Sequence, residues 1–391
     1  MQNFHFYAPT YFAFGRGAEA ETGALVRRFG GSKVLVHYGQ GSVVRNGILS
    51  AVLASLEEAG IPYVELGGVL PNPRSSLVYE GIELCRRESV DFVLAVGGGS
   101  AIDSAKAIAA GVPYEGDFWD YYGQGKPIET ALPIGTVLTI AAAGSEGSGD
   151  SVITNDRTMQ KWGASGEALR PRFSVLNPAF TCTLPPYQTA CGITDIMVHV
   201  LERYFTPTRD VETTDRLCEA VLLSMIAEAP RVMADPACYE ARANIMWAGM
   251  VAHNNIVGVG RAQDWASHNL EHELSALYDC AHGAGLAVIT PAWMEYVWKT
   301  DVDRFARFAH NVWGVDVSDD REAMAREGIR RFRLFLRSIG MPLSFSEIGA
   351  KEEDIPRLVE SLSSLGTVGG FVKIGKAEAE AIYRLALDAH L

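Results

Sequence analysis

The sequence predicts an α/β amino-terminal domain with a parallel sheet, followed by an all-α carboxy-terminal domain. In the first half, short apolar runs that end in glycine alternate with helical patterns, which is typical of a parallel sheet. The second half has long helical patterns and few strand signals. The length of 391 residues is also too great for one ordinary hydrophobic core and favours two domains.

Two buried strands are predicted in the first hundred residues. The runs 33–38 and 91–96 are short, contain β-branched residues and are followed by glycine, which favours strand over helix. Helical patterns over residues 48–59 and 76–88 lie between them. This alternation of strand and helix predicts a layered α/β arrangement.

The second half shows helical periodicity in four segments, which are residues 213–229, 241–253, 265–277 and 322–339. Prolines interrupt the chain near residue 180, at Asn177-Pro178 and at Pro185-Pro186, and indicate a domain boundary there. The sequence therefore predicts an α/β domain over residues 1–184 and an all-helical domain over residues 185–391.

The composition excludes several classes of protein. Apolar residues make up 48% and charged residues 21%, which argues against disorder. The net charge of −13 disfavours binding to nucleic acid. No apolar stretch is long enough to span a membrane, the amino terminus lacks a signal-peptide pattern, and the six cysteines form no C-x-x-C pair. We therefore expect a cytoplasmic protein with reduced thiols that binds neither nucleic acid nor membrane.

The segment Gly97-Gly98-Gly99-Ser100 lies between the second predicted strand and a helix predicted to begin at Ala101. Glycines let backbone N–H groups approach an anion, and the helix amino terminus adds positive dipole character, so a pyrophosphate is a candidate ligand. The segment matches neither G-x-G-x-x-G nor the P-loop pattern, and a tight turn without a ligand is the alternative. For Asp103 and Lys106, three residues apart on this helix, a surface ion pair is the simplest interpretation.

The turn after the first strand bears on the choice of dinucleotide. Folds that prefer NAD usually place a carboxylate there, which accepts from the ribose 2′-OH. The turn Gly39-Gln40-Gly41-Ser42 has no carboxylate. Gly39 leaves space, and Ser42 and Arg45 could contact a 2′-phosphate. The sequence therefore favours NADP(H) over NAD(H).

One aspartate and several histidines are concentrated in the helical half. Asp195 and His199 are four residues apart, which places them on one face of a helix, and His268 and His272 repeat this spacing. His282 follows in a segment with glycine. The most informative set is Asp195, His199, His268 and His282. One carboxylate and three imidazoles suit Fe²⁺ or Zn²⁺ in a site with an open position for substrate. A D-x-x-x-H pair on a helix is more often a surface or capping pair, and the residues alone leave this alternative open.

Residues 96–106 resemble the cofactor motif of the iron-containing (group III) alcohol dehydrogenases. Residues 192–199 and 264–282 resemble the two metal-ligand regions of that family, including the fourteen-residue step from His268 to His282. Further similarity appears at residues 14–17, 71–73 and 184–185. The resemblance spans nearly the whole chain, and it points to the butanol dehydrogenase-like branch that uses NADP.

The resemblance implies the architecture that this family shares with dehydroquinate synthase-like enzymes, and a homodimer. It also implies that Asp195, His199, His268 and His282 bind one divalent metal and that His272 lies near the nicotinamide, with a role in proton relay. Together with the glycine turns, the expected cofactor contacts are Gly39, Gly41, Ser42, Gly97, Gly98, Gly99, Ser100, Asp103, Thr139 and Lys161.

The sequence departs from the family pattern at two positions. Ala143 stands where relatives commonly place a threonine, and Asn177 replaces a frequent aspartate before Pro178. The first departure puts one cofactor hydrogen bond in doubt, and neither involves the expected metal ligands.

We therefore expect a metal-dependent alcohol dehydrogenase or aldehyde reductase that transfers a hydride between NADP(H) and a short- to medium-chain alcohol or aldehyde. The metal would act as a Lewis acid on the substrate oxygen. A glycerol dehydrogenase-like or dehydroquinate synthase-like enzyme of the same fold is one alternative. A metal-dependent hydrolase is another, and it would leave the glycine turn without a role. A binding protein without catalysis is a third, and the intact set of four ligands argues against it.

Aromatic side chains are candidates for the wall of a substrate pocket. They are Phe118, Tyr121, Trp265 and Trp293. Core packing explains each of them equally well, so both interpretations stand at this point.

Overall fold

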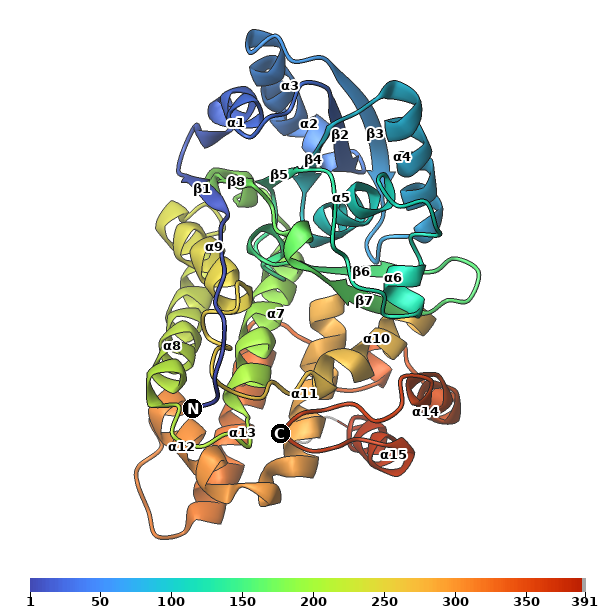
Figure 1. The fold of residues 1–391 in the computed structure, drawn as a ribbon. Helices are drawn as coiled ribbons and strands as arrows, with labels where there is room; N and C mark the ends of the chain where they lie inside the picture. Colours follow the sequence, from blue (N-terminus) through green and yellow to red (C-terminus); the bar gives the residue numbers. More distant parts are fainter. Residues whose placement is uncertain (389–391) are drawn as a thin grey trace. The chain divides into compact units, whose positions relative to one another are not determined.

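The computed structural model describes residues 1–388 and contains a six-stranded sheet in the order β1-β8-β5-β4-β2-β3 (Figure 1). All neighbouring strands in this sheet are parallel. The strands are β1 (Tyr11–Phe14), β2 (Val34–Gly39), β3 (Tyr63–Val69), β4 (Phe92–Gly97), β5 (Ile134–Leu138) and β8 (Phe173–Leu176). A separate antiparallel hairpin consists of β6 (Asp150–Thr154) and β7 (Lys161–Ser165). The predicted parallel sheet is confirmed.

The two strands that the sequence predicted are β2 and β4, and each lies one residue later than expected. β4 is buried along its whole length, which explains its unbroken apolar sequence. Consecutive residues of a strand point to opposite faces of the sheet. Accordingly, Val93 and Ala95 belong to one hydrophobic cluster, and Leu94 and Val96 belong to the other.

Helices cover both faces of this sheet (Figure 1). The cluster on one face includes residues of α4 (Ser75–Glu88) and α5 (Gly99–Gly111), and the cluster on the other includes residues of α1 (Thr22–Arg28) and α3 (Ile48–Glu58). Two further short helices are α2 (Ser42–Arg45) and α6 (Asp120–Gly123). The sheet is therefore the middle layer of three, as expected for an α/β unit.

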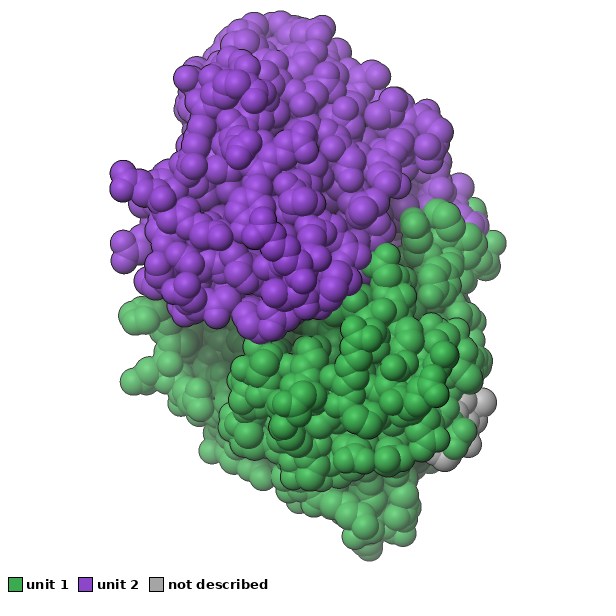
Figure 2. Space-filling model, turned by 90° about the vertical axis from the view of Figure 1, so that its right-hand side faces the viewer, with its two compact units in different colours: residues 1–6, 185–235, 255–391 green, residues 7–184, 236–254 purple. Residues whose placement is uncertain are grey.

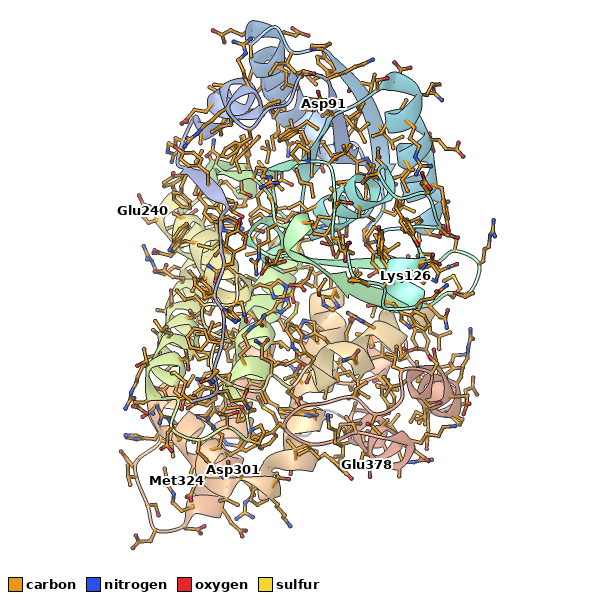
Figure 3. All side chains as sticks on the ribbon, in the orientation of Figure 1. Asp91, Lys126, Glu240, Asp301, Met324 and Glu378 are labelled. Carbon is orange, nitrogen blue, oxygen red and sulfur yellow. The ribbon has the colours of Figure 1, made fainter. Side chains whose placement is uncertain are left out.

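The second half is helical, as predicted. Its helices are α7 (Pro186–Tyr204), α8 (Glu212–Ala234), α9 (Tyr239–His253), α10 (Ala266–Tyr278), α11 (His282–Val297), α12 (Val302–Trp313), α13 (Arg321–Ser338), α14 (Ile355–Ser363) and α15 (Lys376–Leu385). Local sequence defines some of their ends. Asp301, labelled in Figure 3, caps α12 because its carboxylate accepts a hydrogen bond from the Arg304 backbone N–H at 3.1 Å. Within residues 1–388, no helix combines the length and apolar composition needed to cross a bilayer.

Contacts within the chain divide it into two compact units, which Figure 2 colours separately. The unit with the sheet comprises residues 7–184 and 236–254, and the helical unit comprises residues 1–6, 185–235 and the residues from 255 onward. The crossing between residues 184 and 185 coincides with the predicted boundary. The predicted ranges 1–184 and 185–391 differ from this division at residues 1–6 and 236–254.

Helix α9 illustrates why the division is not a single cut. Trp247 of α9 packs edge-on against Phe12 and Phe14 of β1, with ring centroids 5.8 and 5.9 Å apart. α9 also packs on the short 3-10 helices at Ser145–Gly147 and Pro178–Thr181. Helical periodicity indicates that a segment has a buried face but not which neighbour covers it, so the sequence alone grouped α9 with the helices around it.

Candidate functional site

The glycine-rich turn follows a central strand of the sheet. β4 ends at Gly97, Gly98 precedes the helix, and α5 begins at Gly99. From β2 the chain moves to β3 on one side, and from β4 it moves to β5 on the other side. Because β2 and β4 are neighbours, their carboxyl ends form a topological switch point, which is where open α/β sheets bind ligands. The two turns that the sequence singled out, at residues 39–42 and 97–100, therefore come together at this edge.

Close packing explains the glycines of the second turn. A Cβ added at Gly97 would lie 2.7 Å from the Cβ of Ala101, and one added at Gly98 would lie 3.2 Å from Ile140. Thr139, a predicted cofactor contact, is buried, and its backbone N–H donates to the Gly97 carbonyl at 3.0 Å. The segment after β5 thus lies directly against the glycine turn.

Ala143 lies on the same segment and faces the turn. A Cβ added at Gly99 would be 3.6 Å from the Ala143 Cβ, so the side chain at position 143 borders the start of α5. Alanine offers a methyl group here and no hydroxyl, which removes one hydrogen bond that a threonine could make. Lys161, in contrast, begins β7 on the hairpin and is buried there.

Asn177, the second departure from the family pattern, has a local role. Its side-chain oxygen accepts from the Ala179 backbone N–H at 3.0 Å, which caps the 3-10 helix at Pro178–Thr181. Its amide nitrogen donates to the Glu19 carboxylate at 2.8 Å. An aspartate could provide the cap but could not donate to Glu19, so the structure gives a reason for asparagine at this position.

The interpretation of Asp103 and Lys106 as a surface ion pair is wrong. Lys106 is fully buried, and its ammonium group donates to the backbone carbonyls of Ser145, Ser148 and Asp150 at 2.7–2.9 Å. Asp103 accepts from the Ser145 hydroxyl at 2.6 Å and from the Val152 backbone N–H at 2.9 Å. Both side chains therefore fasten the segment 145–152 to α5, behind the glycine turn. Residues three apart share a helix face whether that face is exposed or buried, so the sequence could not show that this face of α5 is buried.

Burial shifts both pKa values. It raises the pKa of the Asp103 carboxyl to about 6, against the opposing charge of Lys106. It lowers the pKa of the Lys106 ammonium to about 8, against the opposing charges of Asp103 and Asp150. Each group therefore loses its charge more easily than in water. The hydrogen bonds to backbone carbonyls stabilise the buried ammonium group of Lys106.

The first turn carries a positive group and no carboxylate. β2 ends at Gly39, and Ser42 begins α2 directly after Gly41. A Cβ added at Gly41 would lie 2.5 Å from Nη1 of Arg45, so the guanidinium group folds back over this turn. A Cβ added at Gly39 would meet only the Val69 carbonyl, at 3.8 Å. The turn therefore has open space at Gly39 and a cation beside Gly41.

The candidate metal ligands converge on one carboxylate oxygen. Oδ1 of Asp195 lies 3.3 Å from Nε2 of His199, 3.6 Å from Nε2 of His268 and 3.8 Å from Nε2 of His282. Asp195 and His199 lie on α7, His268 lies on α10, and His282 begins α11. Ligand atoms of Asp195, His268 and His282 all lie within 4.8 Å of one another. His199 does not belong to this group of three, but it lies close to Asp195, and its ring centroid is 4.4 Å from that of His268.

A close approach of two helices places His282. A Cβ added at Gly283 would lie 2.1 Å from the backbone carbonyl oxygen of Cys191 on α7. Only glycine allows the backbone at the start of α11 to come this near to α7. The neighbouring His282 is thereby held beside Asp195, which lies one helical turn after Cys191.

The chemistry of this cluster fits a divalent cation. Oδ1 of Asp195 and Nε2 of His268 are buried, and neither has a hydrogen-bond partner within residues 1–388. A buried polar atom without a partner costs about 1–3 kcal/mol, and a bound cation removes this cost for both atoms. One carboxylate oxygen and imidazole nitrogens are ligands for both Fe²⁺ and Zn²⁺.

Two buried glutamates that were not predicted from the sequence contact these imidazoles. Oε2 of Glu202 lies 2.5 Å from Nδ1 of His268, and a carboxylate oxygen of Glu271 is hydrogen-bonded to Nδ1 of His282. Burial acts to lower the pKa of His268, but Glu202 and Asp195 raise it to about 9. The spacing contained a signal for Glu202, because positions 195, 199 and 202 share one face of a helix.

His272, the predicted proton relay, lies next to this cluster. Its ligand atoms lie within 4.8 Å of those of Glu271 and His282, and its ring centroid is 5.6 Å from that of His282 and 6.3 Å from that of His268. The helical spacing of His268 and His272 thus puts both imidazoles on the side of α10 that faces His282.

Of the four aromatic candidates for a pocket wall, three belong to the core. Phe118, Tyr121 and Trp293 are 2%, 6% and 1% exposed. Trp265 differs, because it has a left-handed backbone with φ of 67° and packs edge-on against His199 and His268, with centroids 5.7 and 5.4 Å apart. Trp265 is therefore the aromatic side chain of the four that borders the cluster. A strained backbone of this kind often marks a functional site.

Comparison with known proteins identifies the family. Residues 9–178 match the family model of the iron-containing alcohol dehydrogenases, and residues 189–387 match the model of the carboxy-terminal part of that family. The NADH-dependent butanol dehydrogenase A of Clostridium acetobutylicum is 42% identical over 387 residues, which cover 98% of this chain and 99% of the relative. The NADPH-dependent aldehyde reductase YqhD of Escherichia coli is 38% identical over 372 residues, which cover 94% of each chain.

A solved structure supports the same family assignment. The crystal structure of the NADH-dependent butanol dehydrogenase A from Thermotoga maritima has a TM-score of 0.97 to this chain, with 41% identity and 99% of both chains covered. The molecule is thus a metal-dependent, nicotinamide-linked oxidoreductase in its general class. More specifically, the chain belongs to the iron-containing alcohol dehydrogenase family, as the motifs in its sequence suggested.

Proposed function

We propose that this protein transfers a hydride between NADP(H) and a short- to medium-chain alcohol or aldehyde, with one divalent metal held by Asp195, His199, His268 and His282. The observation that carries the proposal is the convergence of three imidazole Nε2 atoms within 3.8 Å of Oδ1 of Asp195. One carboxylate and three imidazoles form a ligand set that would hold a divalent metal beside a substrate oxygen.

The residues of the chain divide the work of the reaction. A divalent metal bound by this cluster supplies Lewis acidity to the substrate oxygen, and the nicotinamide supplies or accepts the hydride. Asp195 and the three imidazoles would hold this ion. His272 lies beside the cluster and accepts or returns the alcohol proton. Gly97 to Ser100, at the amino terminus of α5, orient the pyrophosphate through backbone N–H groups.

The preference for NADP(H) belongs to this proposal. The turn at residues 39–42 has no carboxylate to accept from a ribose 2′-OH, and the Arg45 guanidinium beside Gly41 suits a 2′-phosphate. The butanol dehydrogenases named above are described as NADH-dependent and the aldehyde reductase as NADPH-dependent, so relatives of both kinds exist. The local charge of the turn supports the second kind for this chain.

The proposed enzyme is a cytoplasmic homodimer. β1 lies at the edge of the sheet, where β8 is its one neighbour among the described strands, and Tyr11 and Phe14 of β1 are exposed. Exposed edge strands with aromatic residues are suited to pairing with a second copy. The cytoplasm is proposed because the six cysteines are free thiols in the structure, as expected in a reducing compartment. Size-exclusion chromatography with light scattering tests the dimer.

A single assay tests the reaction. The purified protein, loaded separately with Fe²⁺ under anaerobic conditions and with Zn²⁺, is mixed with butanal and either NADPH or NADH, and the absorbance of the reduced nicotinamide is followed. We expect consumption of NADPH, and faster consumption with NADPH than with NADH. The assay is repeated with short- and medium-chain aldehydes of about two to eight carbons. If none of them causes NADPH or NADH to be consumed, hydride transfer is excluded, and a hydrolase or a binding protein is favoured.

A further inference from the structure

We propose that Glu202 and Glu271 are positioning residues for the metal, because they hold His268 and His282 in the tautomer that turns Nε2 toward the ion and so increase the affinity for it. The inference rests on the metal site proposed above. It assigns a role to two buried acids that do not belong to the proposed set of ligands.

Glu202 is held at both of its oxygens. It lies on α7 and is 1% exposed. Its Oε2 lies 2.5 Å from Nδ1 of His268, and its Oε1 accepts the backbone N–H of the same histidine at 3.0 Å. An ionised carboxylate can only accept hydrogen bonds, so Nδ1 must carry the proton. In a neutral imidazole the other nitrogen, Nε2, then has the lone pair.

When His268 is neutral, which is the form that binds a metal, this lone pair on Nε2 faces a second acceptor. Nε2 of His268 is 3.6 Å from Oδ1 of Asp195, and both atoms are buried without a hydrogen-bond partner within residues 1–388. Two acceptors that face one another repel unless a cation lies between them. The proton position that Glu202 imposes therefore prepares this pair of atoms for a metal ion.

Glu271 acts in the same way on the next helix. It is fully buried on α10, and one of its oxygens accepts from Nδ1 of His282 on α11 while the other accepts from the hydroxyl of Ser275. A Cβ added at Gly285 would lie 2.6 Å from Oε1 of Glu271, so glycine at position 285 leaves the space that this carboxylate occupies. Nε2 of His282 is again the nitrogen that faces Asp195.

The two glutamates connect three helices in series. α7 provides the acceptor for the histidine of α10, and α10 provides the acceptor for the histidine of α11. Each acceptor also adds a negative charge near the ion, which makes the imidazole a stronger donor. Partners of this kind are generally worth 10–100-fold in metal affinity.

The test measures Zn²⁺ affinity of the full-length apoprotein by competition with a chromophoric chelator. The variants are Glu202→Gln and Glu271→Gln, since glutamine keeps the size of the side chain and removes its charge. We expect each variant to bind Zn²⁺ 10–100-fold more weakly than the wild type and to bind NADPH with unchanged affinity. Glu219→Gln is the matched control. Glu219 is also a buried glutamate of the helical unit, but it accepts from Arg307, Asn311 and Tyr204, so its substitution should leave Zn²⁺ affinity unchanged.

A double-mutant cycle shows whether Glu271 acts through His282. In a His282→Ala background, Glu271→Gln should have no further effect on Zn²⁺ affinity, because the imidazole that it holds is gone. An undiminished effect in that background would overturn the inference. If the substitutions prevent folding, ¹⁵N spectra of the Zn²⁺-loaded wild type with labelled histidine provide the test, since a proton on Nε2 of His268 or His282 would contradict the inference.

The outcomes separate this inference from the proposed function. If the wild type binds one Zn²⁺ per chain and the glutamine variants bind it equally well, the role of the two glutamates is refuted and the metal site stands. If the wild type binds no Zn²⁺ and no Fe²⁺, the proposed metal site is refuted, and the role of the glutamates is refuted with it.

Discussion

At the scale of single residues, one oxygen of Asp195 organises the candidate metal site. Three imidazoles from three helices lie within 3.8 Å of it. Removal of any one imidazole would take away one of the nitrogen atoms that lie near this carboxylate. The family resemblance implied these four residues as metal ligands, and the structure places the three imidazole Nε2 atoms near this one oxygen.

Substitution of His268 by alanine tests the set. We expect His268→Ala to lose bound metal and to reduce aldehyde reduction by about a thousandfold or more, because a Lewis acid contributes several kcal/mol. NADPH binding should persist, since the glycine turns lie on the sheet. Metal analysis, the NADPH assay and a fluorescence titration with NADPH measure these three properties. His310→Ala, at an exposed histidine of α12, is the control and should behave like the wild type.

A loss of NADPH binding in His268→Ala equal to its loss of metal would contradict the assignment of metal and cofactor to different sets of residues.

Gly39 is the residue at which the choice of cofactor can be tested. Gly39→Asp should shift the ratio of kcat/KM values for NADPH and NADH at least about tenfold toward NADH, because a carboxylate repels a 2′-phosphate and accepts from a 2′-OH. The structure accommodates the larger residue, since a Cβ at Gly39 meets only the Val69 carbonyl at 3.8 Å. Gly39→Ala adds bulk without charge and serves as the control. An unchanged ratio in Gly39→Asp would show that the ribose does not bind at this turn.

At the scale of elements, the contact between α7 and α11 decides where His282 lies. Gly283→Ala would force the two backbones apart, because the new Cβ would be 2.1 Å from the Cys191 carbonyl oxygen. We expect the free energy of unfolding to fall by about 1–3 kcal/mol and Zn²⁺ binding to become weaker. Urea unfolding and chelator competition measure the two effects. Gly163→Ala is the control, because a Cβ there makes only ordinary contacts, with Val152 at 3.7 Å and with the Ser151 carbonyl oxygen at 3.8 Å. Wild-type Zn²⁺ affinity in Gly283→Ala would mean that this contact does not position His282.

β2 and α5 are connected by a buried histidine. Nδ1 of His37 donates to the Leu66 carbonyl at 2.8 Å, and Nε2 lies 2.8 Å from the hydroxyl of Ser104 on α5. Burial lowers the pKa of His37 to about 4, although the Leu66 carbonyl opposes this shift. His37 is therefore neutral in the folded protein at neutral pH.

This shift predicts a pH dependence of stability. Between pH 6.5 and about 4 the unfolded chain binds a proton at His37 that the folded protein excludes, so the free energy of unfolding falls as the pH falls through this window. The full effect is about 3 kcal/mol. Urea unfolding of the metal-free protein from pH 8 to pH 4 should show a steeper decline for the wild type than for His37→Gln. Parallel profiles would refute the prediction.

At the scale of the whole molecule, the chain forms two compact units that receive different ligands in the proposed function. The candidate metal ligands all lie in the helical unit, and the candidate cofactor residues all lie in the unit with the sheet. Each unit has its own buried apolar residues. Ligands that bind only the folded state stabilise it in proportion to the logarithm of their concentration over Kd.

Removal of the metal should therefore lower the Tm. At a free-metal concentration of about a thousand times Kd, binding contributes about 4 kcal/mol, and a chelator removes this contribution. Calorimetry of loaded and chelated wild-type protein measures the shift. His268→Ala should show no such shift, because it cannot be loaded. An equal shift in His268→Ala would place the stabilising ion elsewhere in the molecule.

The sequence by itself determined the layered α/β unit, the helical second half and the turns after β2 and β4. These features depend on periodicity and on glycine at strand ends, which are properties of single segments. Spacing along a helix also predicted that Asp195 and His199 share one face, and the family resemblance implied the full candidate ligand set at positions 195, 199, 268 and 282. The butanol dehydrogenase-like motifs extended this to the family.

Only the tertiary structure decided which elements meet. It buried Lys106 against backbone carbonyls, placed α9 with the sheet, and paired Glu202 and Glu271 with two histidines. Local sequence indicates which side chains share a face of a helix or strand. The element that packs against that face is a different segment, many residues away in the sequence. That choice depends on how whole surfaces pack, and here glycines at positions 283 and 285 allowed the approach that a larger residue would have prevented.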